Sequence, residues 1–290
     1  MKIETAFSFS REAMLKRCCR EYYLHAFYAY GEYEVGAADS ERNYVHLLKQ
    51  LKSEAAFKES LMSQSLRKVF VDGMNIDELL KSLRYDFFRA KDDMLLGAYE
   101  EDHLANPVLR SFYYDEIGIE KLFTDLHNEL SDWAAELLAN DLFIKLFREE
   151  RHNFYIENDV AFVYVGNIKM YFPLFGIIKS EGLAYCISFV RRREFFDTGA
   201  VLNLLYCRNK LHIPPHNVRH VFLNEADSLY LFTDNESLNI SRTLDDIINR
   251  ADSHFYFANQ LENYFSPFAV PEADSKESCR YCRFREFCKG

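Results

Sequence analysis

Glycine and proline are scarce in this chain, at 10 and 6 of 290 residues. Disordered and low-complexity segments are usually rich in both, so we expect no long segment of either kind. The sequence contains no apolar run of about 18 residues, and we therefore expect no helix that spans a membrane and no membrane partner. The charges of Lys2, Glu4, Arg11 and Glu12 argue against a signal peptide. Together these absences predict a folded, cytoplasmic protein.

A surplus of basic residues is also missing, because the formal net charge is −10. Proteins that bind nucleic acid on their own are usually basic, so strong independent DNA binding is not expected. Positive charge is concentrated locally, and each cluster can be either a solvated face or a contact for phosphate groups. The clusters are Lys16, Arg17 and Arg20; Arg191, Arg192 and Arg193; and Arg280, Arg283, Arg285 and Lys289.

The apolar residues, 49% of the chain, follow a helical period first and a strand-like period later. Ser8 or Ser10 is the expected N-cap of a helix that reaches Gly31. From residue 153 the pattern predicts a three-stranded β-meander, and a helix, two strands and a last helix follow. The other expected helices are about 41–71, 76–95, 118–139, 140–149, 199–211 and 240–264, and the strands are 154–165, 168–178, 183–190, 218–224 and 229–233.

Seven cysteines occur, and five of them lie near the two ends of the chain. Cys279, Cys282 and Cys288 form a C-x2-C-x5-C run, and Cys18 and Cys19 are adjacent. In an intracellular protein, spaced cysteines are more often metal ligands than disulfide partners. Three clustered thiolates need a fourth to complete a zinc or iron–sulfur site, and Cys18 or Cys19 can supply it. Cys186 and Cys207 lie in apolar surroundings and are expected to be buried.

These residues carry a resemblance to a known family. The segment Ser8…Cys18-Cys19-Arg20-Glu21-Tyr22-Tyr23, together with the C-terminal cysteine run, resembles the Fe–S branch of the PD-(D/E)XK nuclease superfamily. That branch includes RecB-like CRISPR-associated exonucleases and the B subunit of the AddAB helicase–nuclease. The family motif has proline where this chain has Cys19.

The resemblance implies a [4Fe–4S] cluster held by Cys18, Cys279, Cys282 and Cys288, with a zinc site as the alternative. It also implies an α/β fold with a restriction-endonuclease-like core, in which helices flank a mixed sheet. We expect a helical part at 1–152, the core at 153–265 and the cysteine tail at 266–290, all in one integrated domain. The site would close a loop of about 260 residues, which chain entropy alone disfavours.

Family members hydrolyse phosphodiesters with Mg²⁺ or Mn²⁺ held by carboxylates. The motifs place a histidine on an early helix, an acid on each of two strands, and a lysine two residues after the second acid. The corresponding positions here are Ser63, Leu174, Ser188 and Val190. Leucine and valine cannot bind a metal ion, and serine replaces a carboxylate poorly. The resemblance therefore predicts a nuclease-like protein without catalytic residues.

A relocated catalytic site is the alternative, and only this alternative calls for Mg²⁺ or Mn²⁺. Its candidate carboxylates and cation are Asp159, Glu181, Glu194, Asp197 and Lys179.

We expect a structural or nucleic-acid-gripping subunit of a DNA-processing or antiviral-defence complex, with protein partners and DNA bound only through them. The arginines expected to meet nucleic acid are Arg20, Arg191, Arg192, Arg193, Arg280 and Arg283. Two other functions remain open: an active DNA exonuclease with relocated carboxylates, and a redox or iron sensor that uses the cysteine site as a switch.

Overall fold

The computed structural model describes residues 6–28, 40–155, 161–264, 266–273 and 276–289. The chain forms two compact units, each built from separate stretches. Unit 1 comprises Met1–Phe57, Arg89–Phe123 and Asn249–Gly290, and unit 2 comprises Lys58–Phe88 and Thr124–Ile248. Both ends of the chain therefore belong to one unit. The boundary expected near residue 153 falls inside unit 2 and coincides with no unit boundary.

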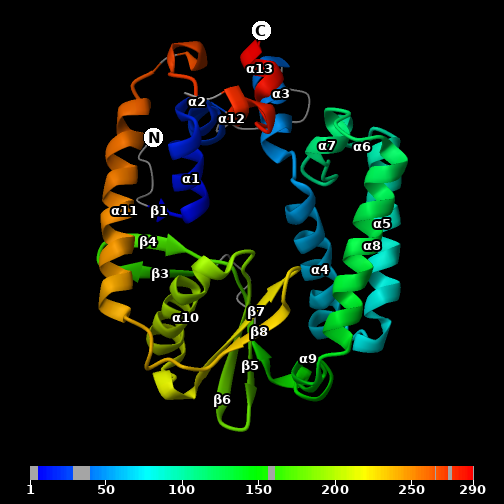
Figure 1. Cartoon of the computed structure of the whole chain (residues 1–290), viewed down its shortest axis with the longest axis vertical. Coiled ribbons are helices and arrows are strands. Elements are labelled where there is room, and N and C mark those ends of the chain that lie inside the picture. The colour runs from blue at the N-terminus through cyan, green and yellow to red at the C-terminus, as the bar shows by residue number, and fades with distance from the viewer. Residues whose placement is uncertain (1–5, 29–39, 156–160, 265, 274–275, 290) are drawn as a thin grey trace. The chain divides into compact units, whose positions relative to one another are not determined.

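Unit 1 is helical and contains all the terminal cysteines. Its apolar core includes Leu15 and Tyr22 from the first helices. They belong to the same cluster as Leu261, at the end of α11 (Ile240–Leu261), and Val270. Figure 1 shows α1 and α2 in blue beside α11 in orange. Its helices are α1 (Phe9–Arg17), α2 (Cys19–Tyr23), the π-helix Leu24–Tyr28, α3 (Ser40–Gln50), α6 (Ala98–Glu101), α7 (Arg110–Tyr113), the 3₁₀ turn Pro267–Ala269, α12 (Lys276–Arg280) and α13 (Arg285–Lys289).

Four long helices contribute residues to both units. Three of them, at 54–71, 79–95 and 119–138, confirm the predicted helical N-terminal half, although the expected helix at 41–71 is two helices, α3 and α4 (Glu54–Val71). Within the described ranges, no helix combines the length and the apolar content needed to cross a bilayer. The four are α4 (Glu54–Val71), α5 (Leu79–Leu95), α8 (Ile119–Leu138) and α11 (Ile240–Leu261).

The first predicted helix is interrupted at Cys18. Ser8 caps α1 as expected, because its Oγ accepts a hydrogen bond from the Arg11 backbone N–H at 3.4 Å. Cys18 then adopts an extended conformation (φ −161°, ψ 115°) and α2 begins at the next residue. The continuous helix to Gly31 was therefore wrong, and residues beyond Tyr28 lie outside the described part. The interruption places a cysteine at the N-terminus of α2.

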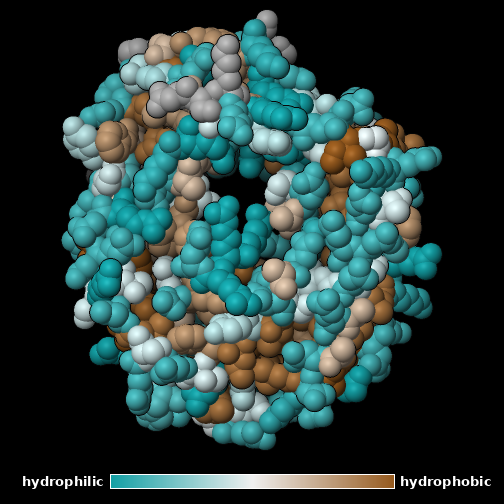
Figure 2. Space-filling model, viewed as in Figure 1, coloured by the Kyte–Doolittle hydropathy of each residue, from teal (hydrophilic) through white to brown (hydrophobic). Residues whose placement is uncertain are grey.

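Unit 2 contains a mixed five-stranded sheet in the order β2-β5-β6-β7-β8. β6 and β7 are parallel, and α10 forms the crossover between them, whereas the other neighbours are antiparallel. Figure 2 shows hydrophobic residues gathered over these strands, low in the view. The elements are α9 (Asp141–Ile144), the π-helix Lys145–Glu149, β2 (Phe154–Tyr155), β3 (Phe162–Val165), β4 (Ile168–Tyr171), β5 (Leu174–Ser180), β6 (Leu183–Phe189), α10 (Phe196–Leu211), β7 (Val218–Asn224), β8 (Ser228–Phe232) and the 3₁₀ turns Ile76–Glu78, Arg151–Asn153, Arg193–Phe195 and Pro215–Asn217.

The predicted meander is instead two separate pairings. The strand expected at 168–178 is divided at Phe172 and Pro173, so that β4 pairs with β3 and β5 pairs with β6. Proline has no backbone N–H to donate, which favours a strand boundary there. The strand expected at 154–165 is likewise divided into β2 and β3, and residues 156–160 lie outside the described part. Helix α10 and strands β7 and β8 agree with prediction to within three residues at each end.

Gly176 on β5 is packed too closely for any side chain. A Cβ placed there would lie 2.3 Å from the Phe154 ring and 3.0 Å from the Tyr155 carbonyl oxygen. The Phe154 ring stacks on Phe70 with centroids 3.6 Å apart, so it cannot move aside freely. We expect Gly176→Ala to lower the free energy of unfolding by about 2 kcal/mol.

The matched control is Gly118→Ala, because a Cβ at Gly118 has no neighbour within 4 Å and the residue has no positive φ. Chemical denaturation of both variants gives the comparison. Equal midpoints for the two variants would show that Phe154 can be displaced without cost.

Candidate metal centre and catalytic positions

Cys18 occupies the N-cap of α2, with its sulfur turned towards the helix end. Its Sγ accepts a hydrogen bond from the Glu21 backbone N–H at 3.4 Å. Arg17 binds the Glu21 carboxylate through Nε at 2.8 Å and Nη2 at 2.6 Å, which fixes the same turn. A backbone N–H aimed at sulfur stabilises a thiolate, and such hydrogen bonds are common around metal-bound cysteines.

The C-terminal cysteines lie on two short helices and the turn between them. Cys279 is on α12 and Cys288 is on α13, while Cys282 lies between the two helices. The Cys282 N–H donates to the Cys279 carbonyl oxygen at 3.1 Å, and the Cys282 Sγ accepts from the Phe284 N–H at 3.4 Å. Cys282 therefore has the same sulfur–amide arrangement as Cys18.

Cys18 contributes to the raised pKa values of two of the tail thiols, Cys282 and Cys288. Burial raises the pKa of Cys282 to about 12, and Glu21, Cys288 and Cys18 act in the same direction. Burial also raises the pKa of Cys288 to about 11, with Arg20 opposing and Cys18 contributing. Both thiols are therefore protonated at neutral pH, and a bound metal would have to displace both protons.

The structure distinguishes Cys18 from Cys19. Cys18 interacts electrostatically with Cys282 and Cys288. Cys19 packs against the apolar core of unit 1, and its Sγ lies 4.0 Å from the Leu15 carbonyl oxygen. These surroundings favour Cys18 as the fourth ligand.

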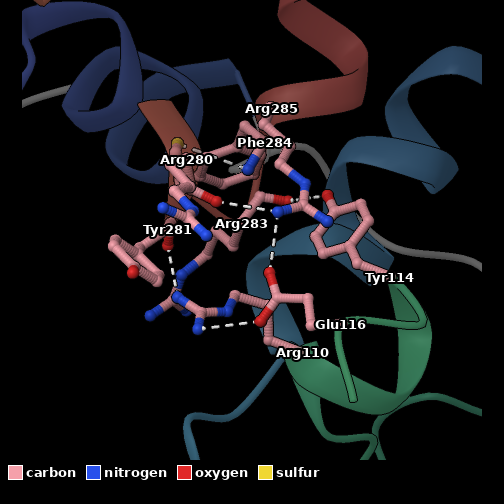
Figure 3. A network of polar contacts seen from close by, with 9 residues as sticks. Arg110, Tyr114, Glu116, Arg280, Tyr281, Arg283, Phe284 and Arg285 are labelled. Carbon is pink, nitrogen blue, oxygen red and sulfur yellow. Dashed lines mark hydrogen bonds and ion pairs between the residues drawn. The ribbon is translucent and has the colours of Figure 1, made fainter. Parts of the chain in front are cut away.

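A network of side chains holds the cysteine tail against the region after α7 (Figure 3). Glu116 accepts hydrogen bonds from Arg110 at 3.2 Å and from Arg285 at 2.7 Å. The Arg285 guanidinium also lies 3.9 Å from the centre of the Tyr114 ring. Three tail carbonyl oxygens accept hydrogen bonds from these side chains. Arg110 donates to Tyr281, Arg285 donates to Arg280, and Tyr114 donates to Arg283. The tail conformation is thus specified by Arg110, Tyr114 and Glu116 of unit 1 together with Arg285 of the tail itself.

Arg20 anchors the segment that precedes the tail. It is 7% exposed, and it donates from Nε to the Val270 carbonyl at 3.1 Å and from Nη2 to the Phe268 carbonyl at 3.3 Å. It also forms an ion pair with Glu272. These contacts account for Arg20 without a nucleic acid, and its contact with nucleic acid stays a prediction.

The two tail arginines that are expected to meet nucleic acid, Arg280 and Arg283, differ in their surroundings. Arg283 donates to the Lys49 carbonyl oxygen at 2.7 Å, and burial lowers its pKa. Arg280 is exposed, with its guanidinium 5.5 Å from the centre of the Tyr281 ring. Only Arg280 of the pair presents its charge to solvent.

The donor chemistry suits a soft metal or an iron–sulfur cluster. The four thiols predicted as ligands belong to unit 1, and two of their sulfurs already accept backbone N–H groups. In the ranges that the structure describes, however, no three His, Cys, Asp or Glu side chains are grouped closely enough to hold a metal ion. The residue types therefore fit the predicted cluster, whereas the sulfurs do not form a closed ligand set.

The positions that the resemblance assigns to catalysis lie in unit 2 and carry Ser63, Leu174, Ser188 and Val190. Leu174 on β5 pairs directly with Ser188 on β6. Ser188 is 2% exposed and its Oγ has no hydrogen-bond partner. Val190 is buried in an apolar cluster with Phe196 and Phe222. The fourth position, Ser63, is half-buried on α4.

The carboxylates proposed for a relocated site are not brought together. Glu181 is exposed in the β5–β6 turn with φ 52°, and it pairs with Lys145 at 2.9 Å. Glu194 and the exposed Asp197 follow the other end of β6, and a strand of this length spans about 23 Å. Lys179 is exposed near Glu181, and Asp159 lies outside the described residues. Glu181 therefore cannot share a metal ion with Glu194 or Asp197.

A buried lysine that the sequence did not reveal lies at the start of unit 2. The Lys58 side chain is 6% exposed, and its Nζ contacts Glu129 at 2.6 Å and also Glu225. These residues come from α4, α8 and the end of β7, so no local motif connects them. Neighbouring Glu59 binds Arg191 through both carboxylate oxygens, at 2.7 and 2.8 Å. Ammonium and guanidinium groups thus neutralise the carboxylates in this region.

The three consecutive arginines are exposed, but each has an acidic partner within unit 2. Arg191 pairs with Glu59, and Arg192 pairs with Glu194 at 3.4 Å. Arg193 pairs with Asp227, which lowers the pKa of that carboxyl. Exposed pairs of this kind are weak and can exchange for phosphate contacts. Their role in nucleic-acid binding stays a prediction.

No protein-family model, curated protein or solved structure matches this chain. The α/β architecture, with a helical N-terminal half and a mixed five-stranded sheet, is established by the structure itself. Any more specific family and function has to be argued from the residues and their geometry.

Proposed function

We propose that this chain is a catalytically inactive PD-(D/E)XK nuclease-like protein whose ends are joined by a [4Fe–4S] cluster. Its function would be structural: to scaffold, or to grip nucleic acid within, a DNA-processing or antiviral-defence assembly. The observation that carries the proposal is the direct pairing of Leu174 with Ser188 at the two acid positions. Neither side chain can hold Mg²⁺ as a carboxylate does.

The order of elements supports the nuclease-like core. The resemblance expects two adjacent strands that carry the acids and a helix after the second strand. β5, β6 and α10 occur in this order, and β7 then adds in parallel to β6. Val190, at the lysine position, packs with Phe196 and Phe222. A catalytic lysine needs a polar pocket, so this apolar surrounding favours a loss of catalysis.

The clasp of the termini is supported by the packing of unit 1. Cys18 lies near Cys282 and Cys288, and Arg20 ties α2 to residues 268–272. A cluster bound here would supply bonds between the first helices and the last dozen residues. Because metal binding to such a site stabilises only the folded state, the cluster would contribute directly to folding free energy.

Two measurements on anaerobically purified protein test the proposal. Iron, sulfide and zinc are quantified together with the absorption near 400 nm, and cleavage of single- and double-stranded DNA is assayed with Mg²⁺ and with Mn²⁺. We expect about four irons per chain, a broad absorption shoulder and no cleavage. One zinc without colour would overturn the cluster.

Metal-dependent cleavage would overturn the assignment as inactive and favour an exonuclease with relocated carboxylates. Glu181→Gln and Asp197→Asn remove candidate ligands of a relocated site, whereas Glu59→Gln, whose carboxylate is bound by Arg191, is the matched control. Cleavage that survives the candidate changes as well indicates a contaminating nuclease.

A further inference from the structure

The β3–β4 hairpin of unit 2 separates its side chains into an apolar face and an aromatic, basic face. Val163, Val165, Ile168 and Met170 alternate along the two strands and are at most 8% exposed. The residues between them point to the opposite side of the hairpin, because successive side chains of a strand alternate. We call this opposite side the outer face, and its residues are Phe162, Tyr164, Lys169 and Tyr171.

The strand register gathers the outer-face residues into one patch. Phe162 pairs with Tyr171, and Tyr164 pairs with Lys169. The Phe162 ring centre lies 5.7 Å from that of Tyr164 and 6.2 Å from that of Tyr171. Tyr164 is 59% exposed, so its ring is accessible from solvent.

Lysines lie directly against these rings. Lys169 Nζ is 4.5 Å from the Phe162 ring centre and 4.9 Å from that of Tyr171. Lys210, exposed near the end of α10, places its Nζ 5.1 Å from the Phe162 ring centre. Within the described part of the chain, Lys210 has no carboxylate partner, in contrast to Arg191, Arg192 and Arg193. The outer face therefore combines fixed positive charge with one exposed aromatic ring, that of Tyr164, and two half-buried rings.

We propose that the outer face of the β3–β4 hairpin, with Lys210, binds single-stranded nucleic acid. Bases stack on Tyr164 and its neighbouring rings, and Lys169 and Lys210 contact phosphates. Aromatic rings beside cations on a strand surface are suited to unpaired bases, whereas the bases of a duplex are already stacked on one another. This inference rests on the proposed nucleic-acid-gripping function and names the surface that performs it.

The test is fluorescence anisotropy of the full chain with a labelled oligothymidylate of about 20 nucleotides, at two salt concentrations. We expect Tyr164→Ala to weaken binding on the order of tenfold. The control Tyr85→Ala removes a tyrosine that is 66% exposed on α5 and should leave binding unchanged. Lys210→Glu should weaken binding, and it should reduce by about one the number of ions released on binding, as read from the salt dependence of the affinity. Lys81→Glu, at an exposed position on α5, should have a smaller effect on both.

Three outcomes overturn the inference. The first is that the wild-type chain does not bind the oligonucleotide, and the second is that each variant behaves like its control. The third is that a duplex of the same length binds equally well, which excludes stacking of unpaired bases. If the chain binds a peptide and no oligonucleotide, the first outcome applies and the face is assigned to a protein partner. None of these results decides the proposed function, because metal content and cleavage are measured separately. Lys210 lies on a helix, so its variant keeps the test valid if Tyr164→Ala misfolds.

Discussion

Replacing Cys18 by serine is expected to abolish metal binding and to lower the unfolding temperature by about 10 °C. Cys18 lies near Cys282 and Cys288, and its Sγ accepts the Glu21 N–H. Serine cannot replace a thiolate as a ligand of iron or zinc. Loss of the site would also release the constraint on a loop of about 260 residues. Metal analysis and a thermal melt of the same preparation measure both effects.

The matched control is Cys19→Ser, one residue along the chain. Cys19 packs on the apolar core of unit 1 beside Leu15, so its replacement should leave the metal content unchanged. The reverse result, with loss of metal only in Cys19→Ser, would assign the ligand to Cys19. Full metal content in both variants would show that the chain termini are not joined through this pair.

Replacing Lys58 by methionine is expected to lower the free energy of unfolding by about 2 kcal/mol. The side chain is buried between two glutamates, and methionine preserves its length but not its charge. Glu129 and Glu225 would then face each other without a counter-ion. Because both are about half exposed, water screens part of the repulsion, and the loss stays below that of a fully buried pair. Urea denaturation measures the change.

Two comparisons isolate the role of Lys58. Lys145→Met breaks a single ion pair with the exposed Glu181 and should change stability little. Adding Glu129→Gln and Glu225→Gln to Lys58→Met should recover part of the lost stability, because the repulsion is then gone. A Lys58→Met variant that is as stable as Lys145→Met would show that the ammonium does not offset the carboxylates.

Local signals in the sequence were sufficient where structure depends on neighbouring residues. Ser8 was an expected cap, and α10, β7 and β8 follow from short-range periodicity and turn residues. The errors occurred where local pattern competes with geometry. Residues 168–178 are apolar apart from Lys169, yet Pro173 divides them between two pairings. Cys18 lies inside an apolar helical pattern, yet the helix is interrupted there.

The candidate sites show the same division. The spacing of Cys279, Cys282 and Cys288 can be read from the sequence, as can Leu174 and Ser188 at positions where the resemblance expects acids. The contacts of Lys58 with Glu129 and Glu225 cannot, because the partners lie on elements that are distant in the chain. The paired lysines and rings of the β3–β4 outer face likewise depend on register, which a one-residue slip would reverse.

The sequence by itself therefore determined the helical first half of the chain, the spacing of its cysteines and the absence of carboxylates where the resemblance expects them. Tertiary structure decided which of these residues meet. It placed Cys18 at the N-cap of α2 and Cys19 against the apolar core of unit 1, and it set Glu181 apart from Glu194 at opposite ends of β6. The physical reason is that helical and strand periods are encoded within a few residues. Contacts between distant segments instead depend on the packing of the whole chain, which no short stretch of sequence specifies.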